Sequence, residues 1–135
     1  MARYPLEITE RTPGVTVKQN TANIETPIIE FEVPALSTVY ISAGSPVYLV
    51  AKDSTGAVIT DGIVTFYAVD PFGIKEIKIA EARIDQLGEL VDINKQYRLR
   101  ASIILREKRK LVIKLISSKV AASVTFRIQA ELETY

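Results

Sequence analysis

The sequence predicts an all-β fold, an antiparallel two-sheet β-sandwich of about eight strands that occupies residues 28–135. Apolar and polar residues alternate with a period of two over most of this range, which is typical of strands with one buried face. Turn residues interrupt the alternation at intervals of roughly 8 to 12 residues. A length of 135 residues suits a single domain. We therefore expect a jelly-roll-like sandwich, with an open Greek-key barrel as the alternative.

The first 27 residues are predicted to form an extended N-terminal arm. Residues 9–27 are rich in Thr and Asn and contain Pro13-Gly14, and only Val15 and Val17 alternate. Two interpretations remain open for residues 1–27. The segment is either a disordered terminus or an arm that becomes ordered along a neighbouring subunit.

Strands are expected through the first half of the sandwich, each ending at a turn sequence. Residues 47–51 and 63–69 are apolar on both faces, as in strands that are central in a sheet. Asp61-Gly62 is the signal of a tight hairpin. The other predicted turns contain Gly, Asp or Pro and cover residues 42–45, 53–56 and 70–73.

Residues 74–84 form a further predicted strand, whose apolar phase slips near Ala80. Such a slip indicates a β-bulge or a bend onto another sheet. Only residues 85–91 could form a short helical turn, and Gly88 argues against a long one.

The last third of the chain predicts three successive antiparallel strands, over residues 97–105, 111–115 and 120–132. Residues 107–109 and 117–119 would join them. From the alternation we expect these residues in the core: Phe66, Leu99, Ile103, Ile113, Leu115, Val124, Phe126 and Ile128.

Charge is distributed unevenly along the chain. Residues 95–119 contain nine basic residues and one acid, Glu107, a net charge of +8. The other 110 residues contain eight basic and fifteen acidic residues, a net charge of −7. Such polarity can attract a polyanion, an acidic partner or a second copy of the chain.

Within this basic segment, six residues are the candidate interface: Arg98, Arg100, Arg106, Lys108, Arg109 and Lys110. The three arginines of residues 98–106 share one face of a predicted strand, so one edge could attract phosphates. No aromatic residue is interleaved there to stack on bases. An ordinary solvated face is the simpler interpretation. A contact between copies would instead pair these cations with acids such as Glu25, Glu30, Glu32, Glu76 and Glu81.

Catalytic, metal and cofactor sites are not expected. The chain has no Cys and no His, which removes thiol chemistry and the commonest general base. Asp53, Asp61 and Asp70 lie at strand ends, but their spacing matches no calcium loop and Asp is a common turn residue. Nor does the sequence single out a carboxylate pair for glycoside hydrolysis. Six tyrosines and no tryptophan leave sugar binding as a weaker alternative.

The arm, the predicted sandwich of residues 28–135 and the divided charge together resemble small virion structural proteins, of the capsid or capsid-decoration type. The resemblance is one of architecture. It implies a homo-oligomer or docking on other shell proteins, with nucleic acid a less favoured partner. It also implies location in the virion after synthesis in the host cytoplasm, since the first residues show no export signal. A carbohydrate- or polyanion-binding β-sandwich module is the competing interpretation.

Overall fold

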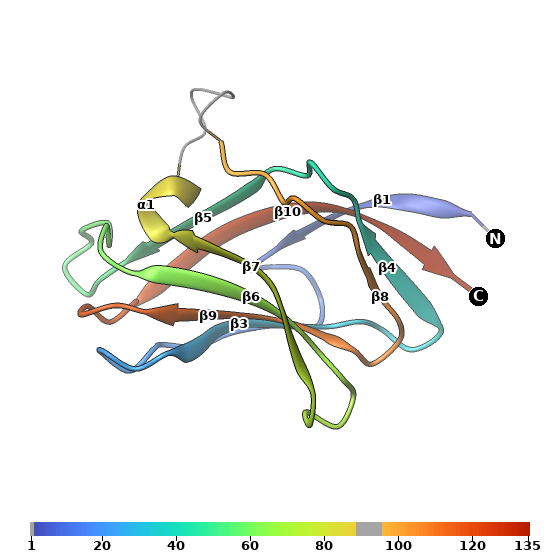
Figure 1. Ribbon diagram of the computed structural model, residues 1–135, viewed down its shortest axis with the longest axis horizontal. Coiled ribbons are helices and arrows are strands. Elements are labelled where there is room, and N and C mark those ends of the chain that lie inside the picture. Colours follow the sequence, from blue (N-terminus) through green and yellow to red (C-terminus); the bar gives the residue numbers. More distant parts are fainter. Residues whose placement is uncertain (1, 89–95) are drawn as a thin grey trace.

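The computed structural model describes residues 2–88 and 96–135, and these residues form two packed β-sheets (Figure 1). Ten strands and one short helix lie in the described residues. They are β1 (Arg3–Thr9), β2 (Val15–Val17), β3 (Thr26–Glu32), β4 (Ser37–Ile41), β5 (Val47–Lys52), β6 (Ile63–Val69), β7 (Glu76–Arg83), α1 (Ile84–Leu87), β8 (Ile103–Leu105), β9 (Lys110–Ile116) and β10 (Ser123–Thr134).

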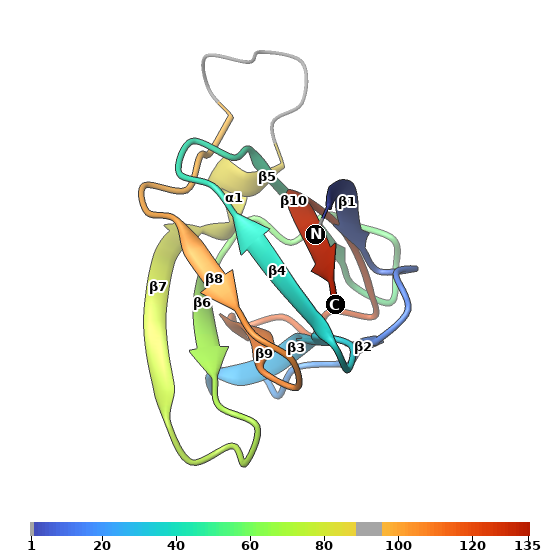
Figure 2. The same cartoon turned by 90° about the vertical axis from the view of Figure 1, so that its right-hand side faces the viewer.

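Each sheet has five strands, and all strand pairs within the two sheets are antiparallel. The first sheet runs β1-β10-β4-β8, with β5 also on β10, and the second runs β2-β3-β9-β6-β7. Residues 123–128 of β10 pair with β5, whereas residues 131–134 pair with β4. Viewed end-on, β7 and β8 lie along one side of the sandwich and β1 and β2 along the other (Figure 2). The predicted two-sheet β-sandwich is confirmed, with ten strands in place of about eight.

The core lies between the two sheets, as the alternation of β10 illustrates. Val124, Phe126 and Ile128 are buried, and the residues between them are exposed. All eight residues predicted for the core are buried. Phe31, Phe66 and Phe126 are the largest of the fully buried side chains. The apolar surface that these residues remove from water is the main stabilising contribution to the fold.

The N-terminal segment lies within the sandwich. β1 and β2 are strands of the two sheets, and they do not form the separate arm that was expected to end at residue 27. β1 pairs with β10 over seven residue pairs, and Ile8 is completely buried opposite Ile128. β2 pairs with β3. The physical reason is that β10 needs a neighbour on its second edge, and Leu6 and Ile8 carry the period of two that places them on its inner side.

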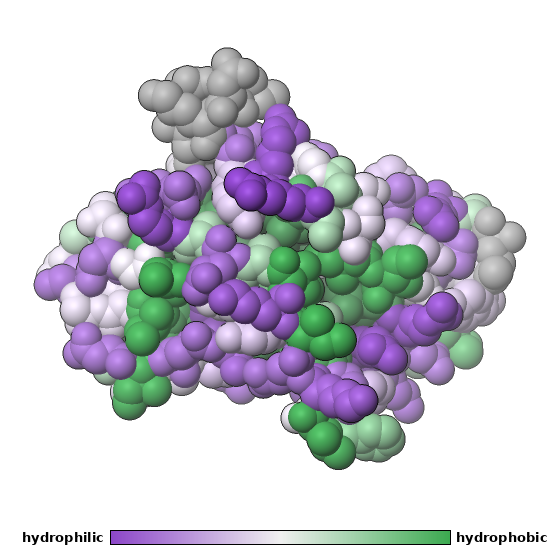
Figure 3. All heavy atoms as spheres, viewed as in Figure 1, coloured by the Kyte–Doolittle hydropathy of each residue, from purple (hydrophilic) through white to green (hydrophobic). Residues whose placement is uncertain are grey.

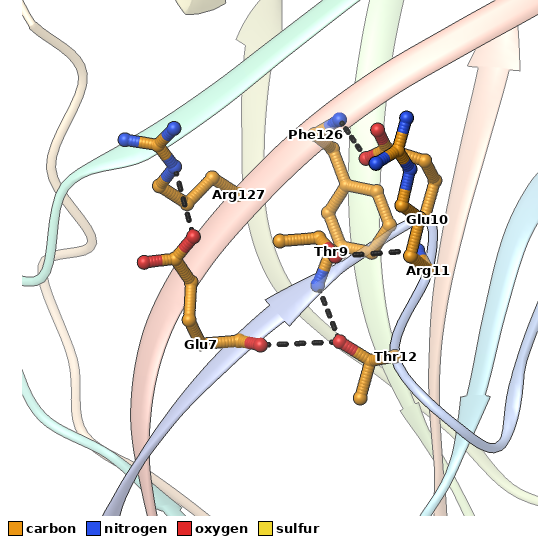
Figure 4. Close-up of polar contacts among 7 residues, drawn as sticks. All are labelled: Glu7, Thr9, Glu10, Arg11, Thr12, Phe126 and Arg127. Carbon is orange, nitrogen blue, oxygen red and sulfur yellow. Dashed lines mark hydrogen bonds and ion pairs between the residues drawn. The ribbon is translucent and has the colours of Figure 1, made fainter.

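Polar contacts hold the end of β1 against β10 (Figure 4). The Thr12 hydroxyl accepts the Thr9 N–H at 2.8 Å and donates to the Glu7 carbonyl at 3.1 Å. Where β1 has ended, the Glu10 carboxylate accepts the N–H of Phe126 at 3.1 Å. Glu7 also forms an ion pair with Arg127 at 3.3 Å. The Glu10 side chain thus pairs with the Phe126 N–H, at a point where β1 no longer runs beside β10.

A second anchor follows at Asn20, which is buried. Its side chain accepts the N–H of Ala121 at 2.7 Å and donates to the carbonyl of Lys119 at 2.9 Å. Asn20 therefore satisfies two backbone groups of the segment that leads into β10, which would otherwise be unpaired near the core.

Three predicted connections are wrong. β8, β9 and β10 alternate between the sheets, so residues 107–109 and 117–119 cross from one sheet to the other and form no hairpins. The strand expected over residues 97–105 is confined to residues 103–105, with an isolated bridge between Arg98 and Pro46. Asp61-Gly62 likewise joins β5 and β6, which belong to different sheets. Apolar alternation gives the inward face of a strand but does not identify its neighbour.

Two local predictions are confirmed in the described residues. Phe66 pairs with Ala80 and Tyr67 pairs with Lys78, so Ile79 is the extra residue of a bulge next to Ala80. The only helix of the described residues, α1, ends at Gly88. The remainder of the helical turn expected over residues 85–91 lies outside the described residues.

Candidate interaction surfaces

Most of the basic residues predicted as an interface lie at the two ends of β8, an edge strand of the first sheet. Arg98 and Arg100 precede β8, and the Arg98 guanidinium donates to the carbonyl of Gly44 at 2.9 Å. Arg106 follows β8 directly. Arg98 forms a bridge with Pro46, whereas Arg106 follows Leu105, which pairs with Val39, so the cations form two groups along one edge.

The second group is presented by a tight turn between β8 and β9. The N–H of Arg109 donates to the carbonyl of Arg106 at 3.1 Å, and Lys108 has a φ of 65°. Val33 holds this turn through two backbone hydrogen bonds, with Lys108 and Arg109. Glu107, the one acid of the basic segment, accepts the N–H of Leu36. The turn is therefore fixed by these contacts, and the side chains of Arg106, Lys108 and Arg109 are exposed.

Five of the six candidates are exposed cations in these two groups, and Lys110 differs from them. Lys110 is half-buried and begins β9 in the second sheet, opposite Glu32. Within residues 2–88 and 96–135, none of the six forms an ion pair. The basic residues were expected as a stripe on one face of a strand. In the structure five of them lie instead at the two ends of β8.

The acids proposed as complements of these cations mostly have partners within the chain. Glu30 pairs with Lys18 at 3.4 Å, Glu76 with Lys114 at 2.9 Å and Glu81 with Lys78 at 3.0 Å. The Lys78–Glu81 pair is exposed on both sides, and such pairs contribute only about 0–1 kcal/mol, so its exchange for a contact with another copy costs little. Lys114 and Glu30 are more enclosed in their pairs.

Tyr67 connects several of these charges on the outer face of the second sheet. Its hydroxyl donates to the Glu25 carboxylate at 2.8 Å, and the Lys114 ammonium lies 4.6 Å from the centre of its ring. The hydrogen bond to Glu25, assisted by desolvation and by the nearby negative charges, raises the pKa of Tyr67 to about 12. This face is a network of paired charges, which is typical of a solvated surface.

The three strand-end aspartates stabilise turns. Asp53 accepts the hydroxyl of Thr55 at 2.6 Å, which holds the pKa of its carboxyl below the usual value. Asp61 accepts the hydroxyl of Ser118 at 2.5 Å, with the same effect on its pKa. Asp70 accepts the N–H of Ile74 at 2.7 Å. The residues that the structure describes contain no group of three acids placed to hold a metal ion.

Exposed apolar side chains form a feature that the sequence analysis missed. Phe72 and Ile74, in the turn between β6 and β7, are 84% and 80% exposed, and Ile77 of β7 is 62% exposed. Ile104 of β8 is also exposed. Figure 3 shows the face that contains the β7 and β8 edges, with apolar side chains in groups separated by polar ones. The available signal was the presence of Phe and Ile in a sequence otherwise typical of a turn.

Two surface hollows have few groups that could act chemically. One, of about 420 Å³, lies between β5 and α1, and its charged residues are Lys52 and Asp85. The other, of about 480 Å³, has Asp61 and Arg83. In the second hollow the Asp61 carboxylate accepts the Ser118 hydroxyl, the contact that stabilises the turn described above. No helix of the described residues is long and apolar enough to cross a membrane.

Comparison of the sequence with protein families and with curated proteins gives no match. Comparison of the structure does. VP17, a capsid protein of bacteriophage P23-77, matches with a TM-score of 0.76 at 8% identity, over 100% of this chain and 98% of that chain. A chain of the VP16-VP17 complex, a complex of the two major capsid proteins of that phage, matches with the same TM-score and identity, and both chains are covered completely. The resemblance to capsid proteins is thereby confirmed for the fold, since the match covers the chain and the described residues form a two-sheet β-sandwich.

Proposed function

We propose that this protein is a structural subunit of a virus capsid, which acts through contacts with copies of itself or with other shell proteins. The observation that carries the proposal is the extent of the structural match. VP17 is covered over 98% of its length, so the match extends over nearly all of that capsid protein. Incorporation in a shell, or on its surface as a decorating subunit, would place the protein in the virion.

The exposed surface supports a role in assembly. Five exposed cations at the β8 edge are without an ion-pair partner among the described residues, and exposed acids lie on the second sheet. Complementary surfaces on one molecule favour association between copies and set its orientation. A polyanion, in contrast, would be repelled by the acids.

The test is a charge reversal, Arg106→Glu with Arg109→Glu, matched by Arg11→Glu with Lys52→Glu. Both double variants change the net charge by the same amount, and all four side chains are exposed. Lys108 is left unchanged so that the turn keeps its conformation. Sedimentation and light scattering would follow assembly in about 0.05 M and about 0.5 M salt, since the Debye length shortens from roughly 14 to roughly 4 Å over this range.

We expect the unaltered protein and the matched control to assemble in low salt and the Arg106/Arg109 variant to remain small. A labelled oligonucleotide serves as the second probe. Constant protein size, together with oligonucleotide binding that weakens steeply with salt, would contradict the assembly role and indicate polyanion binding. An unaltered protein that stays monomeric and binds no oligonucleotide at any salt concentration would also contradict it.

A further inference from the structure

β7 is an open edge of the second sheet. It pairs with β6 on one side, and no other strand of the described residues pairs with it. Figure 2 shows β7 as the outermost strand on its side of the sandwich. Its eight residues include no proline, so its outward backbone N–H groups are available to another strand. The edge strands β2 and β8 are less suitable because they have three residues each, and β1 contains Pro5. β5 pairs only with β10, but its other side is partly occupied, since the N–H of Val47 donates to the carbonyl of Tyr97 and the N–H of Ile59 donates to the carbonyl of Ala51.

The two faces of β7 differ in chemistry. Ala82 is buried, and Ile79 and Ala80 pack against the core, so they lie on the inner face. Ile77 shares that face, because it pairs with Ala68, which also packs against the core. The bulge puts Ile79 and Ala80 on the same side. The outer face carries the four charged residues, Glu76, Lys78, Glu81 and Arg83.

The sequence of β7 is complementary to itself when two copies of the strand are paired antiparallel. In an antiparallel register centred between Ile79 and Ala80, the outer face pairs Glu76 with Arg83 and Lys78 with Glu81. The inner face pairs Ile77 with Ala82, and Ile79 with Ala80.

The bulge makes this register possible. A two-fold axis perpendicular to the sheet keeps each residue on its own face, so paired positions must share a face. In a regular strand, positions 76 and 83 would lie on opposite faces. The extra residue at Ile79 returns them to the same face.

We propose that β7 pairs antiparallel with β7 of a second copy, which joins two five-stranded sheets into one of ten strands. The proposal rests on the assembly role proposed above and names one contact of that assembly. By symmetry the dimer contains two Glu76–Arg83 pairs and two Lys78–Glu81 pairs. The contact is isologous, so it closes on two copies and cannot propagate alone.

Because the chain has no cysteine, disulfide formation can test the register directly. Lys78→Cys and Glu81→Cys are prepared as separate variants, mixed and oxidised. Opposed residues in an antiparallel pair have Cα atoms about 4.5–5.5 Å apart, within disulfide range. Position 78 of two identical copies would be offset by three residues, about 10 Å. The mixed dimer retains one Lys78–Glu81 pair.

We expect covalent dimers in the mixture and none in either variant alone. The matched control mixes Lys78→Cys with Glu76→Cys, whose positions would be offset by five residues, about 17 Å. Cross-linking in the control to the same extent, or no cross-linking in the test mixture, would overturn the proposal. The second of these results would show that the bulge and Lys78 protect the edge from pairing.

Charge exchange gives an independent measurement of dimerisation that needs no cysteine and no cross-link. Lys78→Glu and Glu81→Lys each put two like-charge pairs in the dimer, whereas the double variant Lys78→Glu/Glu81→Lys restores opposite charges. We expect each single variant to weaken dimerisation about tenfold in low salt and the double variant to return close to the original value. Sedimentation equilibrium measures these constants, and equal constants in all four proteins would refute the register.

Failure here is distinguishable from failure of the capsid role. If cross-linking is absent while the Arg106/Arg109 reversal still abolishes assembly, only the β7 contact is wrong. If β7 dimers form but nothing larger than a dimer is found in any salt, the β7 contact stands and the capsid role fails.

Discussion

Replacement of Ile8 by alanine tests whether the N-terminal segment is part of the sandwich. Ile8 is completely buried and lies opposite Ile128 in the pairing of β1 with β10. Truncation of a buried isoleucine to alanine typically costs about 2–5 kcal/mol, through lost burial and the cavity left behind. Because Ile8 is fully enclosed, we expect about 3 kcal/mol. For a domain of this length, that loss corresponds to a decrease in melting temperature of about 10 °C.

Urea unfolding followed by circular dichroism would measure the effect. With a slope of about 2 kcal/mol/M, the midpoint should fall by about 1.5 M. Tyr4→Thr is the matched control, because Tyr4 is in the same strand, is 56% exposed and is replaced by a residue that favours strands. The control should change stability by no more than about 0.5 kcal/mol.

Equal midpoints for Ile8→Ala and Tyr4→Thr would refute this prediction and support an N-terminal arm that lies outside the sandwich. A midpoint that rises with protein concentration would instead show that β1 is contributed by a partner, as an arm that crosses between subunits would require. The fold of the single chain predicts a large loss that does not depend on concentration.

Two further predictions concern backbone strain and pH. Gly62→Ala should destabilise the protein by more than about 1 kcal/mol, because φ is 138° and the new Cβ would lie 2.7 Å from the carbonyl oxygen of Ile116. Gly56→Ala, with φ of 85° and open space around it, should cost less, and equal losses in thermal melts would refute the clash. The pKa of Tyr67 is raised from 10.0 to about 12, so the unfolded chain loses this proton first and stability falls as pH rises between those values. Tyr67→Phe should make that fall shallower, and an unchanged pH profile would contradict the assigned hydrogen bond to Glu25.

The sequence by itself determined the fold class, the inward faces of the strands and the local irregularities. The alternation of Val124, Phe126 and Ile128 is a local property with a period of two, and it survives any choice of neighbouring strand. The phase slip near Ala80 and the end of α1 at Gly88 were predictable for the same reason, since each depends on residues adjacent in the chain.

Only the tertiary structure decided which strands are neighbours and which surfaces are left open. β8, β9 and β10 carry similar alternation, yet they alternate between sheets because strands from residues 3–9 and 37–52 occupy both edges of β10. The tertiary structure likewise divides the basic residues into two groups, because β8 is an edge strand and they lie at its two ends. Pairing depends on contacts between residues far apart in sequence, whereas periodicity reports only the face that each residue takes.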